Sequence, residues 1–170
     1  METLFRGRVW KLGDDINTDL LYPGFARGME WEELRPHILH THPRFNKEVQ
    51  PGDVIVAGRN FGCGSGRPVL EYIIKLGVSC IVADSFARLF FRNSITQPYP
   101  VFSCEGVSAM FEEGDELELD MLEARVKNLT TGKELVGKPL AKEMWDIINA
   151  GGMKKTLQME KEAGRLPWQL

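Results

Sequence analysis

A glycine-rich loop between an apolar segment and a helical pattern constrains the fold more than any other feature of the sequence. Residues 54–58 form a short, continuous apolar run, which is typical of a strand covered on both faces. The loop spans residues 58–67, and Pro68 then opens a helix where its missing N–H costs nothing. Apolar residues repeat at helical spacing until Gly77, so the sequence predicts a tight strand-to-helix connection.

A second strand and helix follow the first pair. Residues 78–83 are again apolar, Ser85 is a candidate helix cap, and residues 86–90 supply the apolar face of the next helix. Strands joined by a helix in this way are usually parallel, and their crossover is right-handed in almost all proteins. We therefore expect residues 54–83 to contain two parallel strands.

The remaining strands have a different character. Residues 5–12 alternate apolar and basic side chains, as in a half-buried strand. Residues 115–120 and 124–129 have the pattern of a strand pair, and residues 141–150 that of a short helix closed by two glycines. The expected fold is α/β, with mixed parallel and antiparallel strands and flanking helices.

The chain is expected to be one domain over residues 1–170. Residues 25–50 are its least regular part, because two prolines interrupt them, and we expect a mobile or partner-contacting region there. Residues 151–170 are expected to form a C-terminal extension.

Composition limits the class of protein. With 170 residues, 43% of them hydrophobic and 26% charged, the chain is long enough to bury a core. The net charge of −3 is spread without a basic stripe, which argues against a nucleic-acid partner. No apolar run approaches the roughly 20 residues of a membrane helix, and no signal peptide is evident, so we expect no membrane contact and a cytoplasmic location. Three widely spaced cysteines suit free thiols in a reducing compartment.

The loop chemistry points to an anionic ligand. Three glycines, Gly62, Gly64 and Gly66, allow positive φ angles and a close approach to backbone N–H groups. The expected helix would place Ser65 and Arg67 at the positive end of its dipole. A guanidinium binds a carboxylate or a phosphate through two parallel hydrogen bonds, so we expect one of these groups as the ligand.

Better-known glycine loops do not match this one. A dinucleotide fingerprint needs glycine where Arg67 stands, and the nucleophile elbow of hydrolases needs glycine where Cys63 stands. The phosphate loop needs a Gly-Lys pair that is absent from residues 58–67. The histidines lie in the irregular segment with a spacing that suits no common metal site, so we expect no metal ligands in this chain.

Three ordered motifs resemble those of one family. They are residues 17–19 (Asn-Thr-Asp), the loop at residues 58–67, and residues 85–93. From about residue 8 to about residue 150, the chain is similar to the small subunits of 3-isopropylmalate dehydratase, which are homologous to the swivelling C-terminal domain of aconitase. The resemblance implies an aconitase-type swivelling β/β/α fold. It also implies a separate large subunit that holds a 4Fe–4S cluster, with no cofactor bound by this chain.

The implied activity is that of a hydro-lyase. The complex would dehydrate and rehydrate a small 2-hydroxy dicarboxylate, isomerising 2- and 3-isopropylmalate in leucine biosynthesis. The iron of the large subunit would bind the leaving hydroxyl as a Lewis acid. The small subunits of homoaconitase and of 2,3-dimethylmalate dehydratase are close relatives, so their substrates remain open.

The resemblance also implies roles for individual residues. Ser65 falls on the catalytic serine, which as an alkoxide removes the carbon-bound proton of the substrate, and Arg67 falls on the arginine that binds a substrate carboxylate. Asp19 falls on an aspartate that borders the site and holds the loop or the arginine in place. A serine hydroxyl is a weak base, so the loop N–H groups, the helix dipole and Arg67 would have to stabilise its oxyanion. Further substrate-binding candidates are Thr18, Gly64, Gly66 and Arg27.

Two positions depart from the family pattern. Gly66 stands where the family usually has a second serine, so one hydroxyl that would contact substrate is missing. Residues 22–29, which include Arg27, correspond to a loop that reads the variable group of the substrate, and they match no known version of it. A non-catalytic module that binds carboxylate or phosphate is therefore an alternative.

Simpler structural roles also remain open. Ser65 alone could be a helix cap, and the loop a tight turn without a ligand. Asp19 could be a turn or capping residue, and Cys63 is more typical of a small buried side chain than of a nucleophile.

Overall fold

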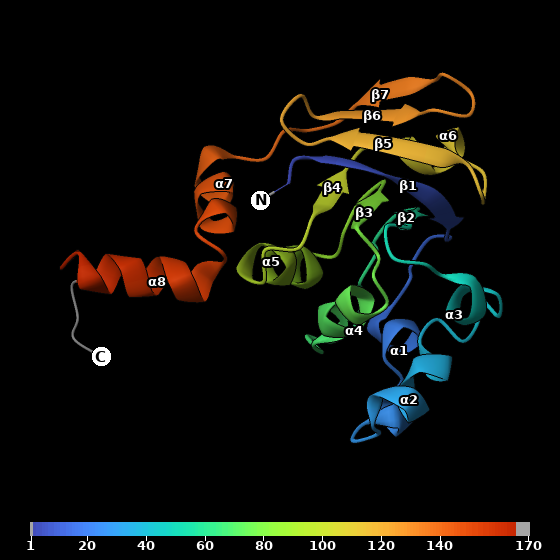
Figure 1. The fold of residues 1–170 in the computed structure, drawn as a ribbon, viewed down its shortest axis with the longest axis horizontal. Coiled ribbons are helices and arrows are strands. Elements are labelled where there is room, and N and C mark those ends of the chain that lie inside the picture. Colours follow the sequence, from blue (N-terminus) through green and yellow to red (C-terminus); the bar gives the residue numbers. More distant parts are fainter. Residues whose placement is uncertain (1, 166–170) are drawn as a thin grey trace.

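A computed structural model describes residues 2–165 and contains a seven-stranded sheet of order β4-β3-β2-β1-β5-β6-β7 (Figure 1). Its strands are β1 (Leu4–Lys11), β2 (Val54–Ala57), β3 (Cys80–Ala83), β4 (Val101–Ser103), β5 (Glu116–Asp120), β6 (Arg125–Asn128) and β7 (Glu134–Val136). The helices are α1 (Thr18–Leu21), η1 (Gly24–Ala26), α2 (Trp31–Leu34), η2 (Arg35–His37), α3 (Phe45–Glu48), α4 (Val69–Lys75), α5 (Arg88–Thr96), α6 (Val107–Met110), α7 (Lys142–Asn149) and α8 (Met153–Glu162).

Strand β1 joins a parallel and an antiparallel half of the sheet. Its residues 9–11 pair in parallel with β2, and its residues 4–8 pair antiparallel with β5. Strands β2, β3 and β4 continue in parallel, whereas β5, β6 and β7 continue antiparallel. The expectation of an α/β fold with mixed strands is confirmed.

The parallel strands are covered on both faces, which explains their continuous apolar sequence. Ile55 of β2 belongs to a core shared with α4 and α5, whereas Val54 and Val56 belong to a second core shared with α6 and with β5 and β6. Figure 1 shows β5, β6 and β7 on one side of the parallel strands and α1, α4 and α5 on the other. The sheet thus curls so that its antiparallel half packs over its parallel half.

Several elements lie where the sequence predicts them. The expected strand at residues 5–12 is β1, the expected pair at residues 115–129 is β5 and β6, and the helix expected at residues 141–150 is α7. The parallel pairing of β2 and β3 is also confirmed. The sequence patterns missed β4, β7 and α6, because each of them is only three or four residues long.

The predicted capping role of Ser85 is wrong. Helix α5 begins at Arg88 after Ala87, and no side chain caps it. The hydroxyl of Ser85 instead accepts a hydrogen bond of 2.9 Å from the backbone N–H of Asn60. A tertiary contact with the glycine-rich loop therefore takes the place of a local cap.

Residues 25–50 form short helical turns that pack onto the body of the domain. Leu34, Ile38 and Phe45 are each exposed by 1% or less, and they belong to the same core as the helix-covered face of β2. Helix α2 is a single turn within this segment. The apolar side chains of this segment account for its packing although its helices are short.

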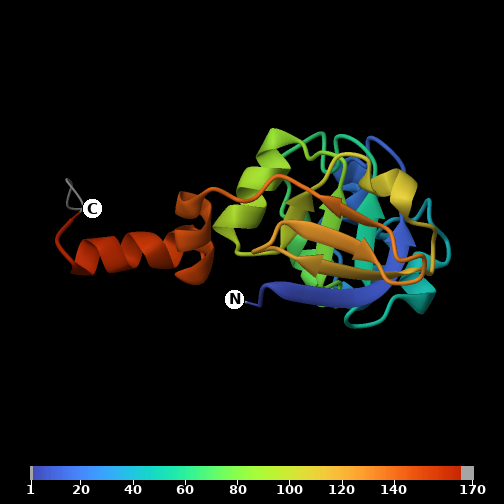
Figure 2. The same ribbon diagram turned by 90° about the horizontal axis from the view of Figure 1, so that it is seen from above.

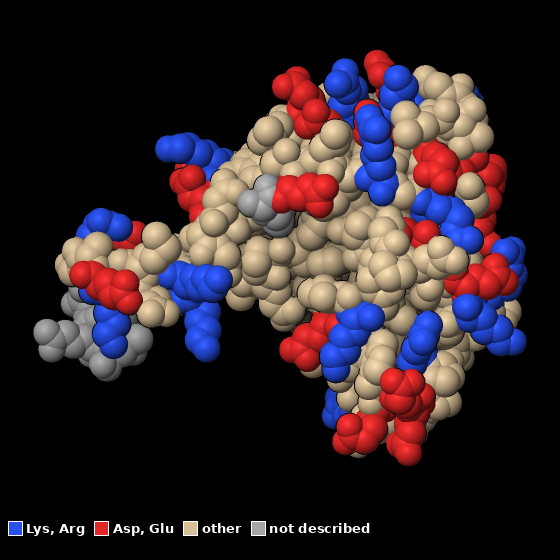
Figure 3. All heavy atoms as spheres, viewed as in Figure 1, with Lys and Arg blue, Asp and Glu red and all other residues tan. Residues whose placement is uncertain are grey.

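The chain continues beyond the sheet in two further helices. Helix α7 buries Ile148 and packs beside α5, whereas α8 buries none of its residues. Seen from above, α7 and α8 lie to one side of the sheet, and α8 points away from it (Figure 2). Acidic and basic side chains are interspersed over the face shown in Figure 3. Within the described part of the chain, no helix is long and apolar enough to cross a membrane.

Candidate active site

Two connections meet at one edge of the sheet. Strands β1 and β2 are parallel, so the segment after β1 and the glycine-rich loop after β2 leave the sheet at the same end. The two segments bind each other through their backbones: the N–H of Thr18 donates to the carbonyl of Cys63 (2.8 Å), and the N–H of Gly62 donates to the carbonyl of Ile16 (2.7 Å). This contact builds the site from residues far apart in sequence.

Two of the loop glycines are required by their surroundings. Gly62 and Gly64 have φ angles of +79° and +102°, and residues that carry a Cβ rarely adopt such backbone conformations. A Cβ on Gly62 would lie 2.2 Å from the ring of Phe90, and a Cβ on Gly64 would lie 2.9 Å from Oγ1 of Thr18. The loop can therefore pack this closely only with glycine at these positions.

Ser65 is held by Thr18. The N–H of Ser65 donates to Oγ1 of Thr18 at 3.0 Å, and the two hydroxyl oxygens lie 3.3 Å apart. Thr18 is the first residue of α1, and the side chain of Asn17 caps that helix by accepting from the N–H groups of Asp19 and Leu20. Because Thr18 is only 2% exposed, its hydroxyl faces the loop and not solvent.

Arg67 is held from the same segment. Its Nη1 donates to the carboxylate of Asp19 and, at 3.0 Å, to the backbone carbonyl of Tyr22. The side chain of Arg67 is 17% exposed, whereas that of Asp19 is 67% exposed. The guanidinium is thus fixed by one edge, and its Nε is a buried donor without a partner in the described chain. Such an arrangement leaves donors for an incoming anion.

An open cavity of about 570 Å³ lies over these residues. This volume suits a small organic ligand. The lining residues are Tyr22, Arg27, Ser65, Gly66, Arg67 and Pro68. A hydroxyl and two guanidinium groups therefore border one space, which is positive in charge and open to solvent.

The structure brings most of the predicted site residues together. Ser65, Gly66, Arg67 and Arg27 line the cavity, and Asp19 binds Arg67. The two remaining candidates, Thr18 and Gly64, lie behind Ser65 and contact each other. The sequence did not single out Tyr22 as a site residue, yet its backbone carbonyl accepts a hydrogen bond from Arg67. Tyr22 does belong to the segment expected to contact the substrate.

The expected contribution of the helix dipole has a geometric limit. Helix α4 has seven residues and begins at Val69, so Gly66, Arg67 and Pro68 separate it from Ser65. The N–H of Ser65 is already bound by Thr18. The contact given to the Ser65 hydroxyl is therefore Thr18 of the other segment, at 3.3 Å.

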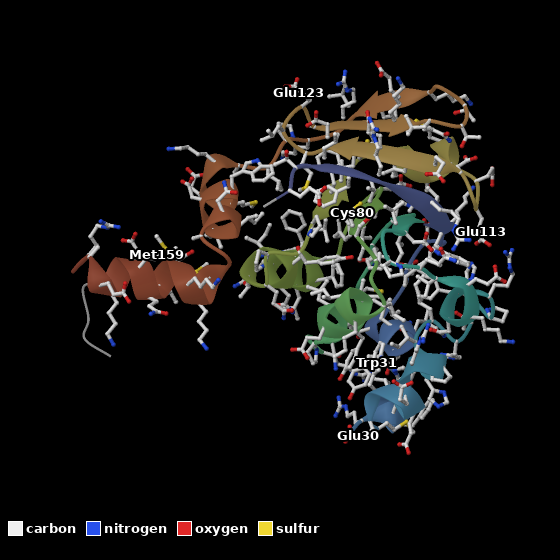
Figure 4. All side chains as sticks on the ribbon, viewed as in Figure 1. Glu30, Trp31, Cys80, Glu113, Glu123 and Met159 are labelled. Atoms are coloured by element: carbon white, nitrogen blue, oxygen red, sulfur yellow. The ribbon has the colours of Figure 1, made fainter. Side chains whose placement is uncertain are left out.

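The described residues do not fit a metal or a cluster. Among residues 2–165, no group of three or more His, Cys, Asp or Glu side chains is placed to hold a metal ion. Cys80 lies inside the domain on β3 (Figure 4), and burial raises the pKa of its thiol to about 12. Burial also raises the pKa of Cys104. Neither of these thiols is suited to bind a metal as a thiolate.

Comparisons with known proteins agree on one group of relatives. The Aconitase C-terminal domain family matches residues 15–99. The chain is 44% identical to the 3-isopropylmalate dehydratase small subunit 1 of Methanopyrus kandleri, covering 94% of this chain and 96% of the relative. It is 43% identical to the isopropylmalate/citramalate isomerase small subunit of Methanocaldococcus jannaschii, over 93% and 96% of the two chains.

A third relative is named for a different activity. One solved structure has the same fold. The chain is 42% identical to the methanogen homoaconitase small subunit of Methanothermobacter thermautotrophicus, over 90% of both chains. The crystal structure of 3-isopropylmalate dehydratase from Methanocaldococcus jannaschii superposes with a TM-score of 0.83 at 32% identity, covering 95% of this chain and 97% of that one. The resemblance noted from the motifs is confirmed.

Proposed function

The chain belongs to the aconitase C-terminal domain family, and from that premise we propose that it is the small subunit of a hydro-lyase that acts on isopropylmalate. One observation carries the proposal: the hydroxyl of Ser65 and the guanidinium of Arg67 border the same open cavity. A base and a carboxylate-binding group on one side of a small cavity are what proton removal from a dicarboxylate requires.

Arg67 binds and orients the substrate. Its contacts with Asp19 and with the carbonyl of Tyr22 hold one edge of the guanidinium, so the remaining donors meet a carboxylate in a fixed orientation. This orientation sets the distance between the reacting carbon and Ser65. Gly66 adds no side chain, so the substrate reaches the backbone of the loop.

Ser65 removes the proton. Its oxyanion takes the proton from the carbon next to the one that carries the hydroxyl. The electron pair of that C–H bond then forms a C=C bond, and hydroxide leaves from the adjacent carbon. Rehydration at the other carbon reverses these steps and yields the isomer. General acid–base catalysis by a positioned group of this kind contributes about 10²- to 10⁴-fold to a rate.

The hydroxide needs a Lewis acid to stabilise it as it leaves. The described residues of this chain do not provide a metal site, and the relatives are named as small subunits. We therefore propose a large subunit that carries a 4Fe–4S cluster and closes the open side of the cavity. Such a cluster would act as a Lewis acid on the hydroxyl. The free thiols suit a complex that works in the reducing cytoplasm.

The choice of substrate rests on residues 22–29. Arg27 lines the cavity together with Ser65 and Arg67, and we expect it to meet the part of the substrate that does not react. The names of the relatives favour isopropylmalate, and the homoaconitase relative makes homoaconitate the second candidate. An additional carboxylate on the substrate would suit Arg27, so Arg27 is the position at which we expect these two substrates to be distinguished.

The test is an anaerobic reconstitution with the large subunit. The complex is expected to dehydrate 3-isopropylmalate, and Ser65→Ala is expected to lower kcat by at least about 100-fold. Ser79→Ala is the matched control, because the Ser79 hydroxyl donates to the backbone carbonyls of Gly52 and Asp53, which precede β2 and so lie at the opposite end of the parallel strands. Full activity of Ser65→Ala would exclude the proposed role of Ser65.

A non-catalytic anion-binding module is the second candidate, and Gly66 in place of the usual serine favours it. Isothermal calorimetry of the chain alone separates the two functions. A module should bind malate or inorganic phosphate tightly without a partner, whereas half of a shared site should bind them weakly.

A further inference from the structure

We propose that Thr18 is a positioning residue for Ser65: its buried hydroxyl holds the loop and donates the hydrogen bond that stabilises the deprotonated Ser65 oxygen. The inference rests on the proposed function, because only a proton-abstracting serine requires such a donor. It also gives Thr18 a partner other than the substrate.

The hydroxyl of Thr18 has a proton that it can donate to Ser65. Oγ1 of Thr18 already accepts a hydrogen bond from the N–H of Ser65 at 3.0 Å. A hydroxyl has one proton to donate and two lone pairs, so that contact leaves its proton free. The Oγ atom of Ser65 lies 3.3 Å away and can accept this proton, and in the neutral pair either hydroxyl can be the donor. Thr18 therefore binds both the backbone and the side chain of Ser65.

The position of Thr18 is determined by its own backbone. Its N–H donates to Cys63 at 2.8 Å, and its carbonyl accepts from Tyr22 at 2.9 Å. The cap provided by Asn17 holds the first turn of α1 in place. With both ends of the residue bound and only 2% of it exposed, the hydroxyl is presented to Ser65 in a fixed orientation, away from water.

Gly64 makes this approach possible. A Cβ at Gly64 would lie 2.9 Å from Oγ1 of Thr18, which is closer than such atoms approach in practice. The positive φ of Gly64 then turns the chain so that the next residue, Ser65, faces the same hydroxyl. The glycine thus serves the contact between Thr18 and Ser65.

Two donors beside Ser65 are already engaged, and Pro68 supplies none. The Ser65 N–H is bound by Thr18, and Pro68 has no N–H to offer. Nη1 of Arg67 is directed to Asp19 and Tyr22. In the described structure, the side chain that forms a hydrogen bond with the Ser65 hydroxyl is Thr18.

The bond strengthens when Ser65 is ionised. An oxyanion only accepts hydrogen bonds, so the proton of Thr18 must then point to Ser65, and a charged acceptor shortens and strengthens the bond. The proton taken from the substrate carbon goes to Ser65, and Thr18 keeps its own proton throughout. Thr18 lowers the cost of forming the base without exchanging atoms with the substrate.

The experiment compares Thr18→Val with Thr18→Ser in the reconstituted complex. Valine has nearly the shape of threonine but no hydroxyl, so kcat on 3-isopropylmalate is expected to fall about 10- to 100-fold, the effect of one hydrogen bond to a charged group. KM is expected to change less than about threefold, because Arg67 is untouched. Serine keeps the hydroxyl and is expected to restore kcat to within about threefold of the wild type.

The pH profile separates a donor from a purely structural role. Without the donor, more alkaline conditions are needed to ionise Ser65, so the pH at half-maximal kcat is expected to rise by about one unit in Thr18→Val. The charged and titratable groups around Ser65 in the described chain are Arg27, Arg67 and Tyr22 at the cavity, Asp19 in its ion pair with Arg67, and Cys63 in the same loop. All of them are unchanged in the variant.

Thr130→Val is the matched control, because the hydroxyl of Thr130 also accepts a backbone N–H bond, from Glu116 at 3.0 Å, but lies at the antiparallel half of the sheet. Its kcat and pH profile should match the wild type. If Thr18→Val does not fold, as judged by its circular dichroism spectrum, Thr18→Ala replaces it, since alanine also lacks the hydroxyl but places no methyl group against the Ser65 N–H.

The outcomes distinguish this inference from the proposed function. Unchanged kcat and pH profile in Thr18→Val, with activity lost in Ser65→Ala, would overturn the role of Thr18 alone. A uniform loss of kcat at every pH, which serine does not restore, would also overturn it. A wild-type complex inactive on both 3-isopropylmalate and homoaconitate would overturn the proposed function and this inference together.

Discussion

The guanidinium of Arg67 is paired with the carboxylate of Asp19, and this ion pair joins two segments that lie 48 residues apart in the sequence. The same guanidinium edge binds the carbonyl of Tyr22. Asp19 is well exposed, so the pair contributes little to folding stability. Its effect is to keep Arg67 oriented toward the cavity beside Ser65.

Arg67→Lys is expected to raise KM for 3-isopropylmalate about 10- to 100-fold. A lysine keeps the charge but has no planar fork for a carboxylate, so two aligned hydrogen bonds become one. Steady-state kinetics of the reconstituted complex measure the change. Arg59→Lys is the matched control, because Arg59 belongs to the same loop and pairs with Asp14 at 2.8 Å, but points to solvent. An unchanged KM in Arg67→Lys would exclude bidentate binding.

Gly64→Ala and Gly66→Ala are expected to differ although both glycines belong to the loop. At Gly64 the positive φ and the contact with Thr18 oppose a Cβ, so alanine should destabilise the protein by about 1–3 kcal/mol and lower kcat at least tenfold. At Gly66 the nearest atom to a Cβ would be Cδ2 of Leu89 at 3.0 Å, at the end of a flexible side chain. Gly66→Ala should change stability by less than about 1 kcal/mol.

Urea denaturation of both variants, with kcat measured in parallel, tests this difference. Equal stabilities of the two variants would contradict the geometry of the loop. The comparison also concerns Gly66, which stands where the family usually has a serine. If alanine is tolerated there, the backbone conformation at this position does not require glycine.

Asp53→Asn is expected to destabilise the fold in a pH-dependent way. Burial would raise the pKa of Asp53, but hydrogen bonds from Arg8, the N–H of Gln50 and Trp10 outweigh it and hold the pKa below its ordinary value. A carboxylate with a lowered folded pKa stabilises the protein above its unfolded pKa of about 3.9, and this stability is lost as the pH falls through the folded pKa.

The cost of Asp53→Asn at pH 7 should be about 2 kcal/mol, since charged hydrogen bonds to Arg8 (2.7 Å) and Trp10 (2.7 Å) are weakened. The difference from the wild type should shrink below about pH 4. Thermal unfolding across pH measures both effects. Asp14→Asn, at an exposed ion pair, should follow the wild type. A difference that persists undiminished at low pH would contradict the assignment.

Alkylation of the folded protein is expected to modify Cys63 and to spare the other cysteines. Burial raises the pKa of Cys80 to about 12 and raises that of Cys104, so neither forms a thiolate at pH 8, whereas Cys63 is partly exposed. Mass spectrometry after brief iodoacetamide treatment gives the labelled positions. The Cys63→Ser variant should remain unlabelled until it is denatured, and a label on Cys80 in the folded protein would contradict the burial.

The local patterns of the sequence were sufficient for the elements that carry the site. The apolar run before the loop predicted β2, the periodic pattern after Pro68 predicted α4, and the glycines between them predicted a tight connection. These features depend on neighbouring residues, so they can be read without knowledge of the tertiary structure. The anion-binding chemistry expected of Arg67 followed from the same stretch, whereas the role proposed for Ser65 rests on the resemblance to the family.

Local patterns failed where a distant segment supplied the partner. Ser85 had the sequence of a helix cap, but its hydroxyl binds the N–H of Asn60 in the loop. The short strands β4 and β7 carry too few residues for an alternating pattern, and pairing with their neighbours decides their structure.

The sequence by itself determined the strand, the glycine-rich loop and the helix, together with the serine and the arginine that the loop presents. Only the tertiary structure decided that Thr18 lies against Ser65 and Asp19 against Arg67. The physical reason is the parallel pairing of β1 and β2, which brings the carboxyl ends of the two strands to one edge of the sheet. That pairing depends on a core assembled from the whole chain, so no local pattern contains it.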